Sequence, residues 1–272
     1  MIPHGVEVMR DIPVGFDGRA AVDLYWHAQG KPTPVIVWIH GGGWMGGDRT
    51  DCGAALQLLD DGFAIASVEY RLSDEAAFPA QVHDCRRPIR WLRPVSHLYN
   101  IRRGYIGAWG ASAGGHLAAL LGTAKNALPE RRHTKATAHA GRVMAVCDWF
   151  GPTDFLRMND RPGAIDHDAP DSPESRLIGG PIRKHPDRVA TANPATYVTA
   201  DCPPFLIMHG ADDDLVLPSQ SRILHDALTC AGVESELIVL EGLGHGFGPD
   251  YPERVMTPVR EFFRRHLRPR RH

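Results

Sequence analysis

The sequence IGAWGASAGGHLAAL, residues 106–120, joins a short apolar run to an Ala- and Leu-rich helical segment through a G-x-S-x-G turn. A serine hydroxyl is a weak nucleophile unless it is held exposed beside a base and near hydrogen-bond donors. A sharp strand-to-helix turn would hold Ser112 in this way, because Gly110 and Gly114 lack the side chains that would collide there. The helix starting near Ala113 would also point its positive end at the site. Ser112 is therefore the candidate nucleophile, although this pattern alone has low specificity.

Apolar runs and helical segments alternate on both sides of this turn, and this alternation predicts a mostly parallel sheet covered by helices on both faces. The first two strands are expected to be antiparallel and at the edge, with a turn near Asp17 and Gly18. Pro88 predicts a kink or break in the second helix. The predicted strands are 6–14, 21–26, 35–39, 64–68, 106–110, 142–147, 205–208 and 236–240, and the helices other than the one after Ser112 are 52–61, 79–97, 218–231 and 251–266.

The strand-helix rhythm is interrupted once, between Pro152 and Thr199, where Pro, Asp, Gly and Arg predominate. A structureless loop of this length is unusual inside a domain, so the segment is expected to be a small cap or lid with short helices of its own. Residues 1–272 show no repeat or linker and are predicted to form a single domain with this insertion. The arginines of the insert would suit an anionic or polyhydroxylated substrate, although exposed arginines usually serve solubility.

Composition gives no sign of a nucleic-acid or membrane partner. The 272 residues are 43% hydrophobic and 23% charged, with a formal net charge of −2. The basic end at 264–272 is expected to be a solvated tail. Five cysteines without a C-x-x-C pair predict free thiols in a reducing cytoplasm, and neither a signal peptide nor a membrane span is visible. We therefore expect a cytoplasmic protein without a metal or another cofactor, with a homo-oligomer left open.

A base and an acid are expected in loops that follow strands, since catalytic groups lie beyond the carboxyl ends of parallel strands. Asp213 follows the run 205–208 and His245 follows the run 236–240, so serine, acid and histidine occur in the order typical of nucleophile-elbow enzymes. Asp213 is preferred over Asp212 and Asp214, and the D-x-D-x-D-G spacing of a calcium loop is absent. His40 and His209 also end strands, but packing or backbone hydrogen bonding is the expected role of both.

The turn His40-Gly41-Gly42-Gly43-Trp44 offers backbone N–H groups for an oxyanion. Gly42 and Gly43 are the candidate donors, together with Ala113 just after the nucleophile. A phosphate-binding loop is disfavoured because no G-K-[ST] follows. The candidate substrate-binding residues are Trp44 and His116.

These motifs resemble the α/β-hydrolase superfamily, and more narrowly the hormone-sensitive-lipase-like esterases and the bifunctional feruloyl and acetylxylan esterases. The resemblance covers nearly the whole chain from about residue 20. It implies an α/β-hydrolase fold with Ser112, Asp213 and His245 at the triad positions. Its motifs are HGGGW with Gly47-Asp48, EYRL at 69–72, FPAQ at 78–81 with Asp84, residues 109–120, GPTD at 151–154, SPES at 172–175 with Gly179-Gly180, 209–216 with Gln220-Ser221, and GHG at 244–246.

The chain departs from these relatives in two places. Ala111 precedes the nucleophile where many relatives carry Glu or Asp, and the N-terminal segment is too short for the helical cap of the lipase-like branch. The insert alone is therefore expected to cover the cleft. The expected function is a serine carboxylesterase that cleaves small acetyl, short-acyl, carbohydrate or aryl esters through an acyl-enzyme. The alternatives are an arylformamidase-type amide hydrolase and a non-catalytic binding protein on the same fold.

Overall fold

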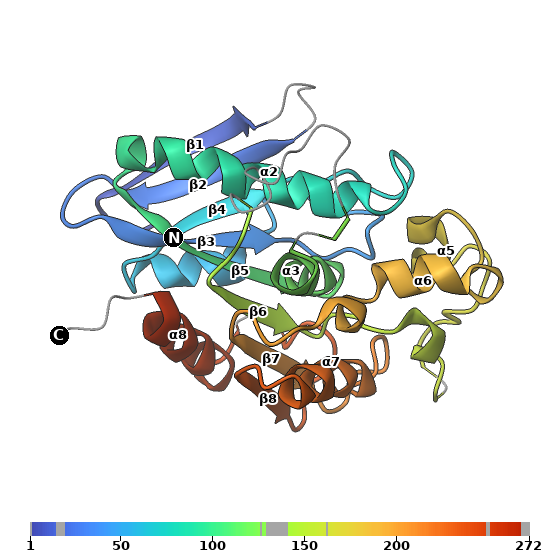
Figure 1. The fold of residues 1–272 in the computed structure, drawn as a ribbon. Coiled ribbons are helices and arrows are strands. Elements are labelled where there is room, and N and C mark those ends of the chain that lie inside the picture. Colours follow the sequence, from blue (N-terminus) through green and yellow to red (C-terminus); the bar gives the residue numbers. More distant parts are fainter. Residues whose placement is uncertain are drawn as a thin grey trace.

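The computed structural model describes residues 2–14, 20–125, 127–128, 141–161, 163–248 and 251–267. Its strands form one eight-stranded sheet in the order β1-β2-β4-β3-β5-β6-β7-β8 (Figure 1). β1 pairs with β2 and β2 pairs with β4 in antiparallel fashion, and the remaining neighbours are parallel. This is the predicted sheet, with its antiparallel N-terminal edge. The strands are β1 Val6–Pro13, β2 Ala21–His27, β3 Thr33–Ile39, β4 Ala64–Val68, β5 Ile101–Ala111, β6 Ala145–Trp149, β7 Phe205–Gly210 and β8 Ser235–Leu240.

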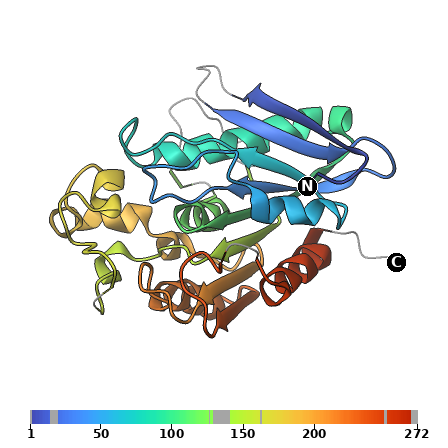
Figure 2. The ribbon, with the colours of Figure 1, turned by 180° about the vertical axis from the view of Figure 1, so that it is seen from behind.

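Two hydrophobic clusters cover the two faces of the sheet because successive side chains of a strand point to opposite sides. Val35 and Val37 of β3 pack into one cluster, whereas Ile36 and Trp38 pack into the other. The first cluster lies under α2 (Ala80–Val95), α3 (Ala113–Thr123) and α7 (Ser219–Cys230). The second lies under α1 (Gly53–Leu56) and α8 (Glu253–Leu267). Both helices can be followed in Figure 2, which shows the molecule from behind.

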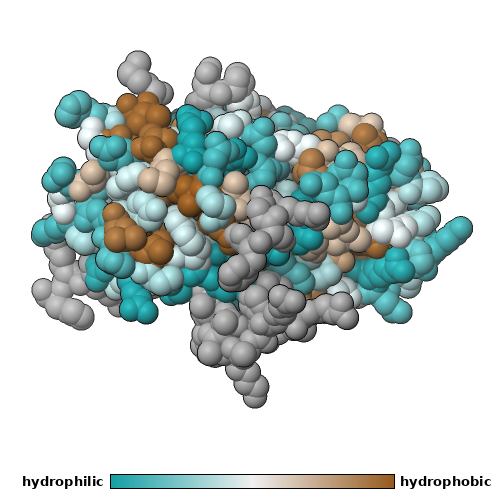
Figure 3. Space-filling model, turned by 90° about the horizontal axis from the view of Figure 1, so that it is seen from above, coloured by the Kyte–Doolittle hydropathy of each residue, from teal (hydrophilic) through white to brown (hydrophobic). Residues whose placement is uncertain are grey.

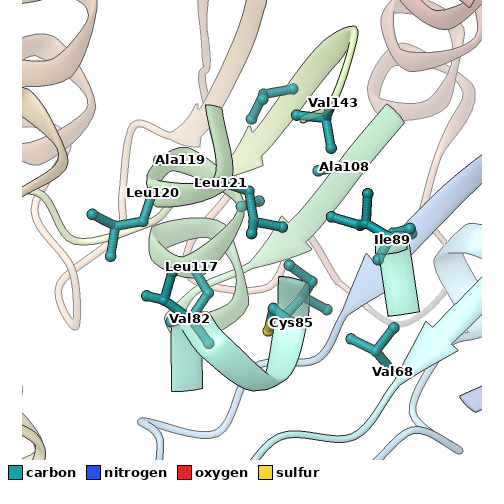
Figure 4. Close-up of a cluster of buried hydrophobic side chains, with 14 of the residues drawn as sticks. Val68, Val82, Cys85, Ile89, Ala108, Leu117, Ala119, Leu120, Leu121 and Val143 are labelled. Carbon is teal, nitrogen blue, oxygen red and sulfur yellow. The ribbon is translucent and has the colours of Figure 1, made fainter. Parts of the chain in front are cut away.

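A kink or a break is expected at Pro88, and the break does not occur, because helix α2 continues through this residue. An interior proline costs about 3 kcal/mol because it lacks the N–H group and its ring clashes with the preceding turn. The buried face of α2 outweighs this cost, since each fully buried aliphatic side chain contributes about 1.5–3 kcal/mol. Figure 4 shows Val82, Cys85 and Ile89 on this face, together with Leu117 and Leu121 of α3.

Three other elements differ in extent from the prediction. The helix expected over 52–61 is only one turn, α1, followed by the 3-10 turn η1 at Gln57–Leu59. The strand expected over 142–147 is β6, which continues to Trp149 because Asp148 is buried within the sheet instead of ending it. The remaining predicted strands and helices are confirmed within a few residues, except β5, which begins at Ile101 instead of 106.

The insert between β6 and β7 carries short helices, as expected, and extends beyond one end of the sheet in Figure 1. They are η3 Phe155–Arg157, α5 Pro173–Ile178, η4 Ile182–Lys184, α6 Pro186–Ala192 and η5 Pro194–Tyr197. Another 3-10 turn, η2 (Ser96–Tyr99), lies between α2 and β5. The turn at Asp17-Gly18 and the end of the chain after Leu267 lie outside the described residues. Before that end, Arg264 of α8 is ion-paired with Asp61.

On the face shown in Figure 3, separate apolar patches lie among hydrophilic residues. In the part of the chain that the structure describes, no helix is both long and apolar enough to cross a membrane. All five cysteines are free thiols, and four of them are buried.

Candidate active site

Ser112 lies at the turn between β5 and α3, where the chain reverses sharply. Its backbone has φ 56° and ψ −120°, a conformation that a residue with a side chain rarely adopts. Its N–H donates to the carbonyl oxygen of Trp149 at 2.8 Å, which fixes the turn against β6. A Cβ on Gly110 would overlap the carbonyl oxygen of Gly114, and a Cβ on Gly114 would overlap that of Ile39. The turn can therefore form only with glycine on both sides of Ser112.

Asp213 and His245 are brought together from the loops after β7 and β8. The Nδ1 atom of His245 lies 2.8 Å from Oδ2 of Asp213. A carboxylate oxygen can only accept, so Nδ1 carries the hydrogen and Nε2 is left as a basic lone pair. The Asp213 side chain is fully buried, whereas the His245 ring is 21% exposed. The ring thus reaches the surface of the pocket while its carboxylate partner is shielded from water.

The Asp213 carboxylate is held by further donors. Oδ1 accepts the N–H groups of Leu215 at 3.0 Å and Val216 at 2.9 Å. Burial alone would raise the pKa of Asp213, but the hydrogen bonds from His209 and His245 outweigh it and hold this pKa well below its usual value. Asp213 therefore carries a negative charge throughout the physiological pH range.

Three backbone N–H groups near Ser112 are free. Gly42 and Gly43 lie in the loop after β3, and Ala113 is the first residue of α3. None of the three N–H groups donates to another residue among those described. Gly42 and Gly43 line the same pocket as Ser112.

Ser112 and His245 line a pocket of about 440 Å³. Between the described atoms of these two side chains there is no hydrogen bond. The lining also includes Met45, Pro173 of the insert, Leu215 and several aromatic residues. Sequence reasoning missed these residues as part of the site. Pro173 lies in the SPES motif and Tyr251 begins the predicted last helix, but neither pattern indicates that the residue faces Ser112. The aromatic residues of the lining are Trp38, Trp149, Phe150 and Tyr251, and the first three of them are at most 3% exposed.

Trp44 and His116 do not line the pocket, in contrast to the expectation that they bind substrate. Both side chains are buried, and their rings pack edge to face with centroids 5.2 Å apart. Nε2 of His116 lies 2.7 Å from the carbonyl oxygen of Ala192 in the insert, and burial lowers the pKa of His116 to about 4. The motif that contains Trp44 places its glycines at the pocket, and the motif that contains His116 places Ser112 there. The side chains of Trp44 and His116 are buried instead, and His116 contacts the insert at Ala192.

His40 packs as expected, stacked on Tyr70 with 4.3 Å between ring centroids. The insert arginines do not converge on the pocket. Arg157 pairs with Asp160 and Arg183 with Asp168, while Arg176 and Arg188 donate to backbone carbonyl groups of the insert. Arg161 lines a different cavity, beside Arg222. Among the described residues, no group of three His, Cys, Asp or Glu side chains could hold a metal ion.

Comparison with known proteins agrees with this architecture. The family model described as BD-FAE matches residues 22–228. Esterase LipC of Mycobacterium tuberculosis is 31% identical over 227 residues, which are 80% of this chain and 54% of LipC. The chain spans about half the length of the curated relatives it matches first.

Two solved structures also superimpose closely. A truncated carbohydrate esterase from gut microbiota has a TM-score of 0.85 at 29% identity, covering 96% of both chains. A bifunctional GH43-CE protein of Bacteroides eggerthii has a TM-score of 0.84 at 31% identity, covering 95% of this chain and 38% of the other. The parallel sheet, the turn at Ser112 and the family match lead to one conclusion: the chain has an α/β-hydrolase fold and belongs to the BD-FAE family.

Proposed function

We propose that this protein is a serine esterase that hydrolyses small carboxylic esters through an acyl-enzyme intermediate. The observation that carries the proposal is that Ser112, the Asp213-paired His245, Gly42 and Gly43 line one pocket. LipC, named as an esterase, supports ester hydrolysis as the reaction class.

In the first half of the reaction, Oγ of Ser112 attacks the ester carbonyl carbon while Nε2 of His245 accepts the hydroxyl proton. The carbonyl oxygen becomes an oxyanion, and the N–H groups of Gly42, Gly43 and Ala113 donate to it. Asp213 stabilises the imidazolium formed at His245. When the tetrahedral intermediate collapses, the bond to the alcohol breaks and His245 returns its proton to the leaving oxygen.

In the second half, water attacks the acyl group on Ser112 and gives a proton to His245. Collapse of the second tetrahedral intermediate releases the carboxylic acid, and the proton on His245 returns to Oγ of Ser112. Ser112, His245 and Asp213 thus end in their starting protonation states.

The shape of the pocket supports small ester substrates with an aryl or sugar group. Its volume of about 440 Å³ lies within the range of small-ligand sites. Tyr251 is the partly exposed aromatic residue of the lining, and its ring is of the kind on which aryl and sugar rings pack. The similarity to a carbohydrate esterase from gut microbiota favours the same substrate class.

Replacement of the nucleophile tests the proposal. Ser112→Ala is expected to lower kcat/KM for p-nitrophenyl acetate by at least about 10⁴-fold, since the acyl-enzyme cannot form. Labelling by a fluorophosphonate probe should disappear with it. Ser96→Ala is the matched control, because Ser96 lies near the opposite end of β5 and should leave both readouts unchanged.

Full activity in a folded Ser112→Ala variant would overturn the serine mechanism. A wild-type protein that neither hydrolyses esters nor reacts with the probe would instead be a binding protein. Comparison of acetyl esters, methyl ferulate, acetylated xylo-oligosaccharides and N-formylkynurenine then separates ester from formamide hydrolysis and ranks the substrates.

A further inference from the structure

A second histidine contacts the Asp213 carboxylate. His209 is at the end of β7, and its side chain is fully buried. Its Nε2 lies 3.1 Å from Oδ2 of Asp213 and 2.7 Å from the carbonyl oxygen of Val216. Its Nδ1 lies 2.6 Å from Oγ of Ser221 in α7. His209 therefore joins three segments at the carboxylate: β7, α7 and the loop between them, residues 211–218, which carries Asp213 and is called the acid loop below.

The surroundings of the His209 ring decide where its hydrogen lies. Nε2 faces two oxygens that can only accept, so Nε2 carries a hydrogen and shares it between Asp213 and Val216. In the neutral ring, Nδ1 then accepts the hydroxyl hydrogen of Ser221. A donor at Nδ1 draws electron density from the ring and strengthens Nε2–H as a donor. Ser221 thereby reinforces the bond to Asp213.

Oδ2 of Asp213 consequently receives two N–H donors, one from His209 and one from His245. In the described part of the chain, these two rings are the titratable groups that bond to the carboxylate. Phe150 packs against both rings. The residue of α7 that bonds to the His209 ring is Ser221, which carries no charge. His167 of the insert reaches the same loop only at the Leu215 carbonyl oxygen.

We propose that His209 is a positioning residue, which together with Ser221 fixes the orientation and charge of Asp213 and so adjusts how strongly His245 holds its proton. The inference rests on the proposed function. Loss of the His209 donor leaves more negative charge on Oδ2, which favours the imidazolium form of His245. A base that stays protonated to higher pH loses activity at the acid side of the profile.

The test is the pH dependence of kcat/KM in His209→Leu and His209→Gln. In His209→Leu, the acid limb should move upward by about one pH unit, and the plateau should fall roughly tenfold because the carboxylate is less well held. His209→Gln should restore the wild-type limb, since its amide nitrogen can replace Nε2 as the donor. His225→Leu is the matched control, because His225 also bonds to a serine, Ser235, without contacting Asp213.

Ser221→Ala keeps the His209 ring and should give a smaller shift in the same direction. If His209→Leu does not fold, this variant decides alone. If His209→Leu folds and its acid limb is not shifted, the inference is overturned. If His209→Leu does not fold, an unshifted acid limb in Ser221→Ala overturns it. A merely structural role would lower the folded fraction without moving the limb.

Titration of the His245 ring followed by NMR, with the signal assigned by its loss in His245→Gln, needs no substrate. An upward shift of the His245 titration in His209→Leu therefore supports the inference even if the wild-type protein hydrolyses no ester. An unchanged His245 titration overturns it. Failure of the proposed function appears separately, as absent hydrolysis and absent labelling of Ser112.

Discussion

Asp213 differs from its two acidic neighbours in what surrounds its side chain. Asp212 and Asp214 are exposed, whereas Asp213 is buried and bonded to His245. Asp213→Asn keeps the shape of the side chain but removes the charge that stabilises the imidazolium. We predict a fall in kcat/KM for p-nitrophenyl acetate of about 10³ to 10⁴-fold, the size of effect seen when the acid of a serine triad is neutralised.

Asp212→Asn and Asp214→Asn are the matched controls for that measurement, and both should stay within about twofold of wild type, as surface changes usually do. A large loss in either neighbour, with Asp213→Asn active, would move the acid to another residue of the run.

The candidate residues could be found from the sequence because they follow strands, and the ends of parallel strands meet at one edge of the sheet. Ser112, Asp213 and His245 are therefore placed by topology. Side-chain direction is a different matter. His209 ends a strand like many buried histidines, and only the packing of α7 and the acid loop turns its ring toward Asp213.

At the scale of elements, the start of α3 is pressed against the end of β3. A Cβ on Gly114 would overlap the carbonyl oxygens of Ile39 and His40, which are backbone atoms that cannot rotate away. We predict that Gly114→Ala lowers the free energy of unfolding by about 3 kcal/mol, the upper end of the usual cost of overpacking. Urea unfolding followed by circular dichroism measures the change.

Gly46→Ala is the control for Gly114→Ala, since a Cβ on Gly46 would meet no atom within 4 Å. It should change the free energy of unfolding by less than about 0.5 kcal/mol. Equal losses in the two variants would contradict the close contact between α3 and β3.

Helix α2 shows where local sequence rules fail at this scale. Pro88 correctly signals a lost backbone hydrogen bond, yet the helix continues because its buried face packs against α3 and the sheet. That packing depends on residues more than twenty positions away, such as Leu117, which no window of sequence around Pro88 contains. Tertiary contacts of this kind also extend β6 through the buried Asp148.

At the scale of the whole molecule, the insert is fastened to the acid loop. Nε2 of His167 lies 2.9 Å from the carbonyl oxygen of Leu215, and Nδ1 lies 2.9 Å from the buried Glu174 carboxylate. The N–H of Ala164 also donates to the carbonyl oxygen of Asp214. These contacts hold Pro173 and Leu215 at the pocket, so the insert shapes the site.

Burial opposes the charge on His167, but the hydrogen bond and charge of Glu174 prevail, and the pKa of His167 is raised above its ordinary value. The ordinary pKa of a histidine is about 6.5. A raised pKa in the folded state means that the folded protein binds the proton more tightly than the unfolded chain does. The resulting stability is therefore fully present below about pH 6.5 and is lost as the pH rises through the higher pKa of the folded state.

Glu174→Gln tests this linkage, because it removes the charge while keeping the shape of the side chain. The variant should be less stable than wild type by about 3 kcal/mol near pH 6, the usual cost of breaking a buried pair. The difference should shrink toward pH 9 as His167 of the wild type loses its proton. Asp160→Asn, which breaks an exposed pair of the same insert, should cost less than about 1 kcal/mol at every pH. Urea unfolding from pH 6 to pH 9 measures both variants, and a Glu174→Gln deficit that stays constant or grows with pH would show that His167 does not hold the insert as a charged group.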